Sequence, residues 1–397
     1  MQETPHRSHP HPWRNVTVLS CTIFFTLTGL FSWERLRGLW LRDMGATELQ
    51  IGWVLFLLAF ANRLPQLIGG YLADRFGRRR MVAIMTMAMA FCYAGIGLAP
   101  TWPLAMACNA ACWIIGAMQW PAMLLLVMEP VPEHQRGRAA AILEGASLAG
   151  VASGFLLGWF VLDRIDLMHG GWRLLCLVTA GCYLCCSIAR GLGLVETAAR
   201  NEKPLLAQLG AISWRIILLP TAVMVCASGA YVILADSSVQ SFYLHDVSRF
   251  DERSINLVNF VWALVAMPAA FVAGWLADRF GSSRMIFVSC LLVIGMMAPF
   301  LVKGLPPSTA PVLFVLMALP AELFTVSWHK LITTITPAAS RGLSVAASGM
   351  LAGFALPWAS PLATSLYAEN VRWPFIAAIA TAVVGAMLAL LVKKPRK

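Results

Sequence analysis

Charged residues are scarce in this chain of 397 residues: only 12% are Asp, Glu, Lys or Arg, whereas 59% are hydrophobic. Soluble domains carry about 25% charged residues, which they need to cover a water-facing surface. The apolar residues also occur in long blocks, as expected when a lipid bilayer is the solvent. The composition therefore excludes an ordinary soluble protein and predicts an integral membrane protein.

Motifs for enzymatic chemistry are also absent. The sequence has no Gly-x-x-x-x-Gly-Lys-Ser/Thr loop to hold nucleotide phosphates, and no zinc or nucleophile constellation. Cys182 and Cys185 resemble half of a redox or zinc site, but a buried free cysteine usually acts as a small hydrophobe. We therefore expect neither an enzyme nor an ATP-driven pump, and no cofactor or metal.

The net charge of +11 is the remaining sign of a possible nucleic-acid partner. The basic residues lie mostly in short loops between apolar blocks, which is a membrane-orientation pattern, so we expect no nucleic-acid binding. Residues 1–15 contain His6, His9 and His11 but no apolar core. They predict a cytoplasmic tail rather than a signal peptide, with a metal-binding histidine tract as the alternative.

Twelve apolar blocks are long enough to span a bilayer as helices, and backbone groups in lipid must be bonded internally. We expect these spans at Val16–Trp40, Leu49–Tyr71, Met81–Leu98, Leu104–Met128, Ala139–Leu162, Leu174–Leu194, Leu218–Tyr243, Ile255–Leu276, Met285–Leu301, Val312–Ile335, Leu343–Tyr367 and Pro374–Val392. Lys and Arg concentrate in the loops on the side of the N-terminus, which places both termini in the cytoplasm.

Three pairs of segments recur at nearly the same offset. Gly70-Tyr-Leu-Ala-Asp74-Arg-Phe-Gly77 recurs as Gly274-Trp-Leu-Ala-Asp278-Arg-Phe-Gly281, Leu41-Arg-Asp43 as Leu244-His-Asp246, and Pro132-x-x-x-Arg136-Gly137 as Pro337-x-x-x-Arg341-Gly342. The recurrence indicates a duplicated unit of six helices. Two such units have the same orientation, which predicts a pseudo-two-fold axis along the membrane normal and a solute site between them.

The segment from Gly70 to Arg79 resembles the signature loop of the major facilitator superfamily, and its second copy lies between the expected helices eight and nine. The resemblance implies an all-α fold of twelve transmembrane helices in two parallel six-helix repeats. The expected divisions are a tail at 1–15, a six-helix bundle at 16–194, a cytoplasmic central loop at 195–215, a second bundle at 216–392 and a basic tail at 393–397.

The resemblance also implies a cytoplasmic gate. In the family, the Asp and Arg of this loop latch the cytoplasmic side shut, a role carried over to Asp74, Arg75 and Arg78. The alternative is that the arginines only fix topology. We expect Gly77 and Gly281 to permit a left-handed backbone. We expect Asp278 and Arg279 of the second copy to form a weaker latch, because Ser282 and Ser283 stand where the first copy has Arg78 and Arg79. We expect Gly70 and Gly274 to allow close helix packing.

Ionisable residues at membrane depth are costly and are functional candidates by default. They are Glu34, Arg35, Arg37, Arg63, Glu144, Asp236, Glu322, His329 and Lys330, and most fall on helices 1, 7 and 10, which line the cavity in the resembled family. Arg190 is expected to snorkel to the interface. Asp236, Glu322 and Glu34 are candidate proton carriers, and Arg35, Arg37 and Lys330 candidate anion ligands. The alternative is that these residues only neutralise one another.

The function expected from these observations is secondary transport of a small organic solute by alternating access, coupled to protons. The alternatives are an uncoupled facilitator, a drug or metabolite efflux antiporter, and a membrane sensor. The helix-5 stretch from Gly150 to Trp159 lacks the proline of drug antiporters, and Asn109 stands where they tend to have arginine; both departures disfavour that class. We expect a monomer in a bacterial inner membrane.

Overall fold

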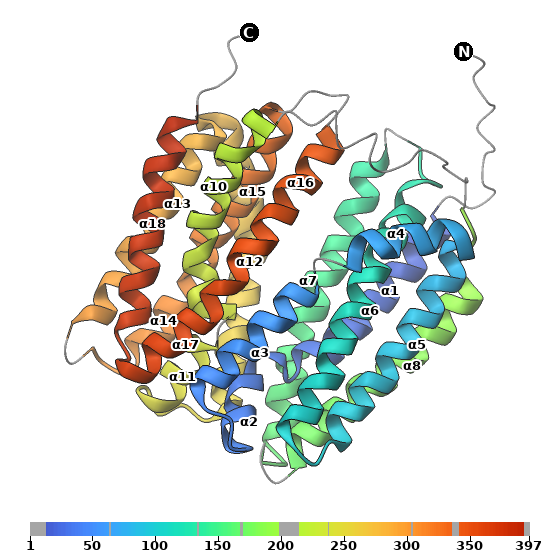
Figure 1. The fold of residues 1–397 in the computed structure, drawn as a ribbon, viewed down its shortest axis with the longest axis horizontal. Helices are drawn as coiled ribbons and strands as arrows, with labels where there is room; N and C mark the ends of the chain where they lie inside the picture. Colours follow the sequence, from blue (N-terminus) through green and yellow to red (C-terminus); the bar gives the residue numbers. More distant parts are fainter. Residues whose placement is uncertain are drawn as a thin grey trace. The chain divides into compact units, whose positions relative to one another are not determined.

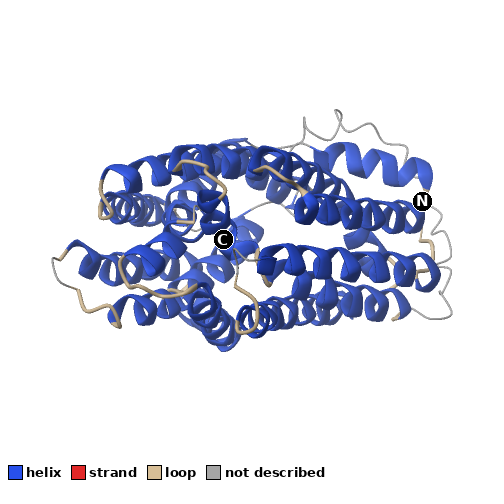
Figure 2. Cartoon of the chain, turned by 90° about the horizontal axis from the view of Figure 1, so that it is seen from below, coloured by secondary structure: helices blue, strands red, loops and turns tan. Residues whose placement is uncertain are grey.

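The computed structural model describes residues 13–62, 65–132, 135–166, 170–197, 214–236, 238–302, 305–335 and 341–392. Within these residues the regular structure is entirely helical (Figures 1 and 2). The chain divides into two compact units. Unit 1 holds the described residues up to Trp33 and from Pro65 to Thr197, and unit 2 holds Glu34–Asn62 and everything described from residue 214 onward.

Unit 1 is built from the helices α1 (Arg14–Phe31), α4 (Pro65–Phe76), α5 (Arg78–Leu98), α6 (Trp102–Met128), α7 (Arg136–Leu162) and α8 (Trp172–Gly193). Unit 2 contains η1 (Glu34–Leu36), α2 (Arg37–Asp43), α3 (Glu48–Ala61), α10 (Trp214–Tyr231), the π-helical turn η4 (Val232–Asp236), α11 (Val239–Asp246), α12 (Glu252–Phe280), α13 (Ser282–Met297), η5 (Ala298–Leu301), α14 (Thr309–Leu316), α15 (Ala318–Ile335), α16 (Arg341–Ala355), η7 (Leu356–Trp358), α17 (Ala359–Glu369) and α18 (Trp373–Leu391).

Ten helical stretches in the described residues are long and apolar enough to cross a membrane. The other two expected spans are each made of two helices, α3 with α4 and α16 with α17, which are broken near Asn62 and at η7. Large apolar side chains cover the exterior, with Phe91 69% and Phe271 83% exposed. An apolar exterior is stable in lipid and costly in water, so the all-α membrane fold expected from the sequence is confirmed.

Close helix packing in unit 1 depends on glycine. A Cβ atom added at Gly150 would lie 2.6 Å from the backbone oxygen of Phe24, and one at Gly154 would lie 2.8 Å from that of Thr28. These contacts join α7 to α1, as the glycine pattern of this stretch predicts. At Gly274, a tight helix contact was also expected but is not found. A Cβ atom added there would meet only Val326, at 4.0 Å.

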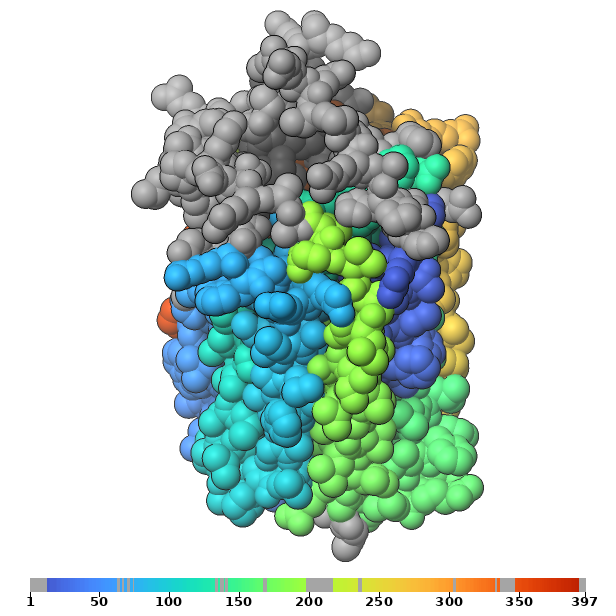
Figure 3. All heavy atoms as spheres, turned by 90° about the vertical axis from the view of Figure 1, so that its right-hand side faces the viewer, coloured from blue at the N-terminus to red at the C-terminus, as the bar shows by residue number. Residues whose placement is uncertain are grey.

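Arg190 of α8 lies inside unit 1 and does not snorkel, so that expectation is wrong. Its side chain is 2% exposed, and it donates to the hydroxyl of Thr22 at 2.9 Å and to that of Thr86 at 2.8 Å. Gln119 of α6 donates to the same Thr86 hydroxyl at 2.7 Å. Hydroxyl groups of α1 and α5 accept hydrogen bonds from the guanidinium group inside the bundle. The Arg190 side chain therefore does not have to extend to the membrane surface. Figure 3 shows α5 and α8 side by side on the outer face of unit 1.

The core of unit 2 contains a group of aromatic rings. Phe300 stacks on Phe375 with ring centroids 4.3 Å apart, and Tyr243 lies edge-on to both rings. These residues join α11, η5 and α18 near the end of the unit where the seventh span finishes. We call this the distal end, and we call the end of each unit that carries Gly77 or Gly281 its signature end. The distal aromatic core provides a rigid support for the polar groups described next.

Candidate functional site

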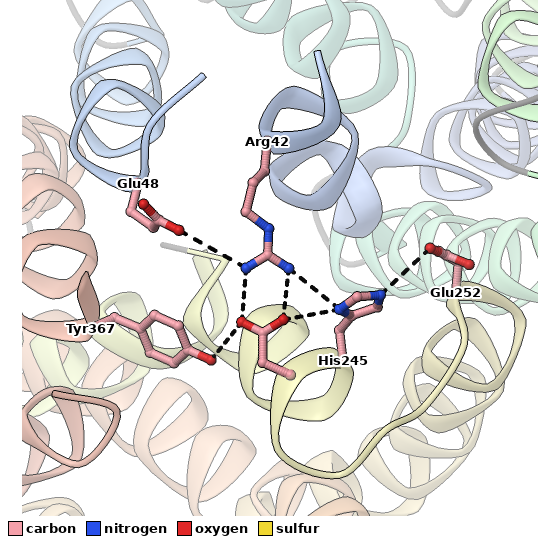
Figure 4. Close-up of polar contacts among 6 residues, drawn as sticks. Arg42, Glu48, His245, Glu252 and Tyr367 are labelled. Atoms are coloured by element: carbon pink, nitrogen blue, oxygen red, sulfur yellow. Dashed lines mark hydrogen bonds and ion pairs between the residues drawn. The ribbon is translucent and has the colours of Figure 1, made fainter. Parts of the chain in front are cut away.

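An ion-paired network lies at the distal end of unit 2 (Figure 4). Arg42, the penultimate residue of α2, donates from Nη1 to Oδ2 of Asp246 at 2.8 Å and from Nη2 to Oδ1 at 2.7 Å. Asp246 is the last residue of α11. The two parallel bonds form the bidentate geometry that makes an arginine–carboxylate pair both strong and directional. The side chains are 24% and 31% exposed, so water screens the pair only partly.

Four further residues complete what we call the distal network. Tyr367 of α17 donates to Oδ2 of Asp246 at 3.1 Å, and the Nδ1 atom of His245 lies 3.0 Å from Oδ1. Glu48 at the start of α3 lies 4.0 Å from Arg42, and Glu252 at the start of α12 lies 4.0 Å from His245. Arg42 also stands 5.0 Å from the ring centre of the buried Phe242. The distal network therefore holds the ends of α2, α3, α11, α12 and α17 together.

Two close backbone crossings accompany the distal network. A Cβ at Gly38 of α2 would lie 2.5 Å from Cβ of Ser238. A Cβ at Gly52 of α3 would lie 2.7 Å from Cα of Pro361 and would also overlap the Thr364 hydroxyl of α17. Only glycine fits at either crossing without a shift of the neighbouring helix. The segment Glu34–Asn62 is therefore packed tightly against α11 and α17 within this unit.

The first and seventh spans are both interrupted just before they reach the distal network. The 3-10 turn η1 separates α1 from α2, and the π-helical turn η4 followed by Ser238 separates α10 from α11. Ser238 has φ of 70°, which is a costly conformation for a residue with a side chain. Such breaks leave helix ends free to reorient, and they are common at functional sites.

The structure brings three of the predicted cavity residues together in unit 2. Glu34 lies 3.2 Å from Arg37 and 4.0 Å from Arg35, and Arg37 is only 7% exposed. Ser241 of α11 donates to the backbone oxygen of Arg35 at 2.9 Å, which ties η1 to the seventh span. Asp236 ends η4, but its side chain lies outside what the structure describes, as does Arg63.

The residues predicted on helix 10 lie on α15 and do not form one cluster. Glu322 is half-buried near the start of the helix, and His329 is exposed with its ring centre 5.2 Å from that of Trp328. Lys330 donates to the side chain of Asp278 and, at 2.9 Å, to the backbone oxygen of Ala277. Lys330 therefore lies beside the second signature copy, and the cavity role of these three residues stays a prediction.

The first signature copy is built around the buried Arg78, which is 3% exposed and forms an ion pair with Glu129 at the end of α6. Its backbone N–H donates to Glu196 at 3.1 Å, as does that of Arg79. Gly77 and Gly281 have φ of 89° and 90°, so both loops use the left-handed backbone that the sequence indicates. Arg75 lies over the Phe76 ring and Arg279 over the Trp275 and Phe280 rings. The side chain of Asp74 is outside the described residues.

The distal network was not predicted from the sequence. The pair Leu41-Arg-Asp43 and Leu244-His-Asp246 indicated a repeat, but not that Arg42 of one copy binds Asp246 of the other. The one signal for this pairing in the sequence was that both repeats carry charged residues at the same position. Glu129 and Glu196 were not predicted either, because both follow apolar blocks and have the pattern of loop residues.

Ten long apolar helices among the described residues, with large apolar side chains on their exposed faces, place the chain in the class of multispan membrane proteins. Residues 15–319 and 250–397 match the sequence profile of the Major Facilitator Superfamily. The chain belongs to this superfamily of transporters.

Two curated relatives show how far the likeness extends in sequence. The niacin transporter NiaP of Acinetobacter baylyi is 30% identical over 139 residues, which is 34% of this chain and 30% of that protein. The multidrug resistance protein MdtH of Klebsiella pneumoniae is 31% identical over 146 residues, 35% of each chain. The chain thus matches about a third of the length of these relatives.

Two solved structures show the likeness in fold. A bacterial homologue of the human lysosomal transporter Spinster, in an inward-facing and unoccupied conformation, has a TM-score of 0.77 at 16% identity and covers 97% of both chains. The D-xylose–proton symporter has a TM-score of 0.76 at 16% identity, covering 96% of this chain and 98% of that one. At this identity the likeness establishes the fold alone.

Proposed function

We propose that this protein moves a small organic solute across a membrane by alternating access, and that the distal network is the latch that closes one end of the pathway. The observation that carries the proposal is the bidentate bond between Arg42 and Asp246. It joins the first span to the seventh, which the sequence repeat assigns to opposite halves of the chain. A transporter that opens at the distal end has to break this bond in every cycle.

The chemistry of the latch suits a reversible contact. The Arg42–Asp246 pair is half-buried, so its strength lies between the ~0.2–1 kcal/mol of an exposed pair and the larger values of a buried one. The interrupted spans at η1 and η4 give the helix ends a place to bend. A closed state favoured by a few kcal/mol leaves the open state accessible to a solute that binds it better.

We further propose coupling to protons. Asp246 and His245 lie in the latch itself, and Glu34, Asp236 and Glu322 lie on the spans expected to line the pathway. A proton on Asp246 would neutralise the carboxylate that holds Arg42. Burial raises the pKa of Asp246, but the hydrogen bonds and charge of Arg42 outweigh burial and lower it, so the proposed proton uptake accompanies separation of the pair. The D-xylose–proton symporter has the same fold, which supports this proposal. An uncoupled facilitator is the first alternative.

A drug or metabolite exporter is the second alternative, and the match to MdtH favours it.

The proposed setting is a bacterial inner membrane, with both termini in the cytoplasm and the distal end outside. We propose that a monomer is the working unit and that the predicted division at 195–215 separates the two repeats. Small solutes, protons and lipid are the proposed partners.

The test is solute-driven proton movement in proteoliposomes that contain a pH-sensitive dye. The panel includes niacin, D-xylose and puromycin. Asp246→Asn, Asp236→Asn and Glu322→Gln are compared with Asp43→Asn, because Asp43 is exposed and is the repeat equivalent of Asp246. We expect proton flux with at least one solute, unchanged in Asp43→Asn and lost in one of the other three variants. Solute flux without proton flux in every variant would leave a facilitator, and no flux with any solute would leave the transport proposal unsupported.

A further inference from the structure

The signature end of unit 1 carries a groove that neither the latch nor the solute pathway explains. It has a volume of ≈ 570 Å³ and is lined by Phe76, Arg79, Arg80, Ala83, Ile84, Gly191 and Glu196. These residues belong to the end of α4, the start of α5 and the end of α8. The groove therefore lies where two neighbouring helices of the outer face reach the loops (Figure 3).

The groove has one apolar side and one basic side. Phe76 and Ile84 are 61% and 66% exposed, and Leu192 next to the groove is 74% exposed. Along the same face, Ile188 of α8 is 52% exposed. Apolar side chains this exposed on a membrane helix contact lipid tails, so the open side of the groove faces the bilayer rather than water.

Of the three charged residues that line the groove, Glu196 and Arg79 are held by other groups in the described part of the chain, and Arg80 is not. The carboxylate of Glu196 accepts backbone N–H bonds from Arg78 and Arg79 and is thereby fixed at the start of α5. Arg79 is directed to the backbone oxygen of Gly191, with Nε donating at 3.0 Å. Arg80 is exposed and forms no ion pair or hydrogen bond with the part of the chain that the structure describes.

We propose that this groove binds an anionic phospholipid, with the headgroup phosphate on Arg80 and an acyl chain along the apolar faces of α5 and α8. A cation at the membrane edge beside exposed apolar side chains matches a phosphate attached to a hydrocarbon tail. A free phosphate would use only the basic side of the groove.

The second repeat supplies the matched control. Arg284 of α13 is the repeat equivalent of Arg80 and is also exposed. Ser282 and Ser283 stand where the first copy has Arg78 and Arg79. The two arginines therefore share a position in the repeat and a charge but differ in what surrounds them.

The experiment measures binding of the water-soluble lipid dihexanoyl phosphatidylglycerol to the purified full chain in a neutral detergent. Inorganic phosphate and dihexanoyl phosphatidylcholine are the comparison ligands. We expect phosphatidylglycerol to bind, Arg80→Gln to weaken its affinity about fivefold, and Arg284→Gln to leave it unchanged. Equal affinity in Arg80→Gln and the wild type would overturn the proposal. Equal affinity for inorganic phosphate would assign the groove to a free anion, and equal affinity for phosphatidylcholine would show that charge does not select the lipid.

Discussion

The two signature copies have nearly the same sequence up to Gly77 and Gly281, yet they place their charges in opposite ways. In the first copy the loop supplies the cation, Arg78, and the helix across from it supplies the acid, Glu129. In the second copy the loop supplies the acid, Asp278, and α15 supplies the cation, Lys330. Among the side chains that the structure describes, each copy thus forms one ion pair, and the charged loop residues of the two pairs, Arg78 and Asp278, do not occupy equivalent positions in the repeat.

The two ion pairs also differ in burial. The side chain of Arg78 is 4% exposed, whereas those of Lys330 and Asp278 are 37% and 76% exposed. A buried charge that loses its partner is left desolvated, while an exposed one is solvated by water or lipid headgroups. The first copy is therefore expected to be a structural lock and the second a weak contact that the protein forms and breaks at low cost.

The largest effect is expected from Glu129→Gln, which breaks the first ion pair and leaves Arg78 buried beside a neutral side chain. We expect a loss of stability of up to about 3 kcal/mol. The measurement is thermal unfolding of the purified protein in detergent, followed by intrinsic fluorescence. Glu144→Gln serves as the control, because Glu144 is an exposed acid on the next helix. A melting temperature equal to that of the control would show that the Arg78–Glu129 pair is not a lock.

A smaller effect is expected from Glu196→Gln, which keeps an acceptor at the start of α5 but removes its negative charge. The interaction of a carboxylate with a helix N-terminus is worth ~0.3–1 kcal/mol, so we expect a destabilisation in that range. Hydrogen exchange of the amides of Arg78 and Arg79 measures it locally. Unchanged protection of both amides would mean that hydrogen bonding alone, without charge, holds this end of the helix.

The smallest effect is expected from Lys330→Gln, which breaks the second ion pair. Because Asp278 is largely exposed and Lys330 is more than a third exposed, we expect less than about 1 kcal/mol of destabilisation and a melting temperature close to that of the wild type. If Lys330→Gln destabilised the protein as much as Glu129→Gln, the contrast between the two copies would be wrong. Loss of solute flux at normal stability would instead indicate that Lys330 acts in transport.

Much of the fold follows from the sequence, because length and hydrophobicity are local signals. The apolar blocks predicted the spans, and Gly77 and Gly281 predicted the two positive-φ turns. The breaks at Asn62, η4 and η7 were not predicted, because a span is read from hydrophobicity over about twenty residues, and Asn62, Asp236 and Pro357 lie within stretches that are apolar overall.

The site was less predictable because ion pairs join residues that are far apart in the chain. Glu34, Arg35 and Arg37 are neighbours in sequence, and their grouping was predicted. The partners of Arg42, Arg78 and Lys330 lie on other helices and depend on how those helices pack. Arg190 shows the same limit, since its burial depends on hydroxyl groups of α1 and α5 that no sequence pattern connects to it.

The most direct test of the account asks whether the distal network has to separate during transport. Arg42→Cys and Asp246→Cys are introduced together into a chain without its ten native cysteines, and a short bifunctional thiol reagent links them. The account predicts that the link stops solute flux in proteoliposomes, that a reducible link restores it on reduction, and that each single variant treated with the reagent still transports. Full solute flux through the linked protein would contradict the account, because the distal end would then not need to open.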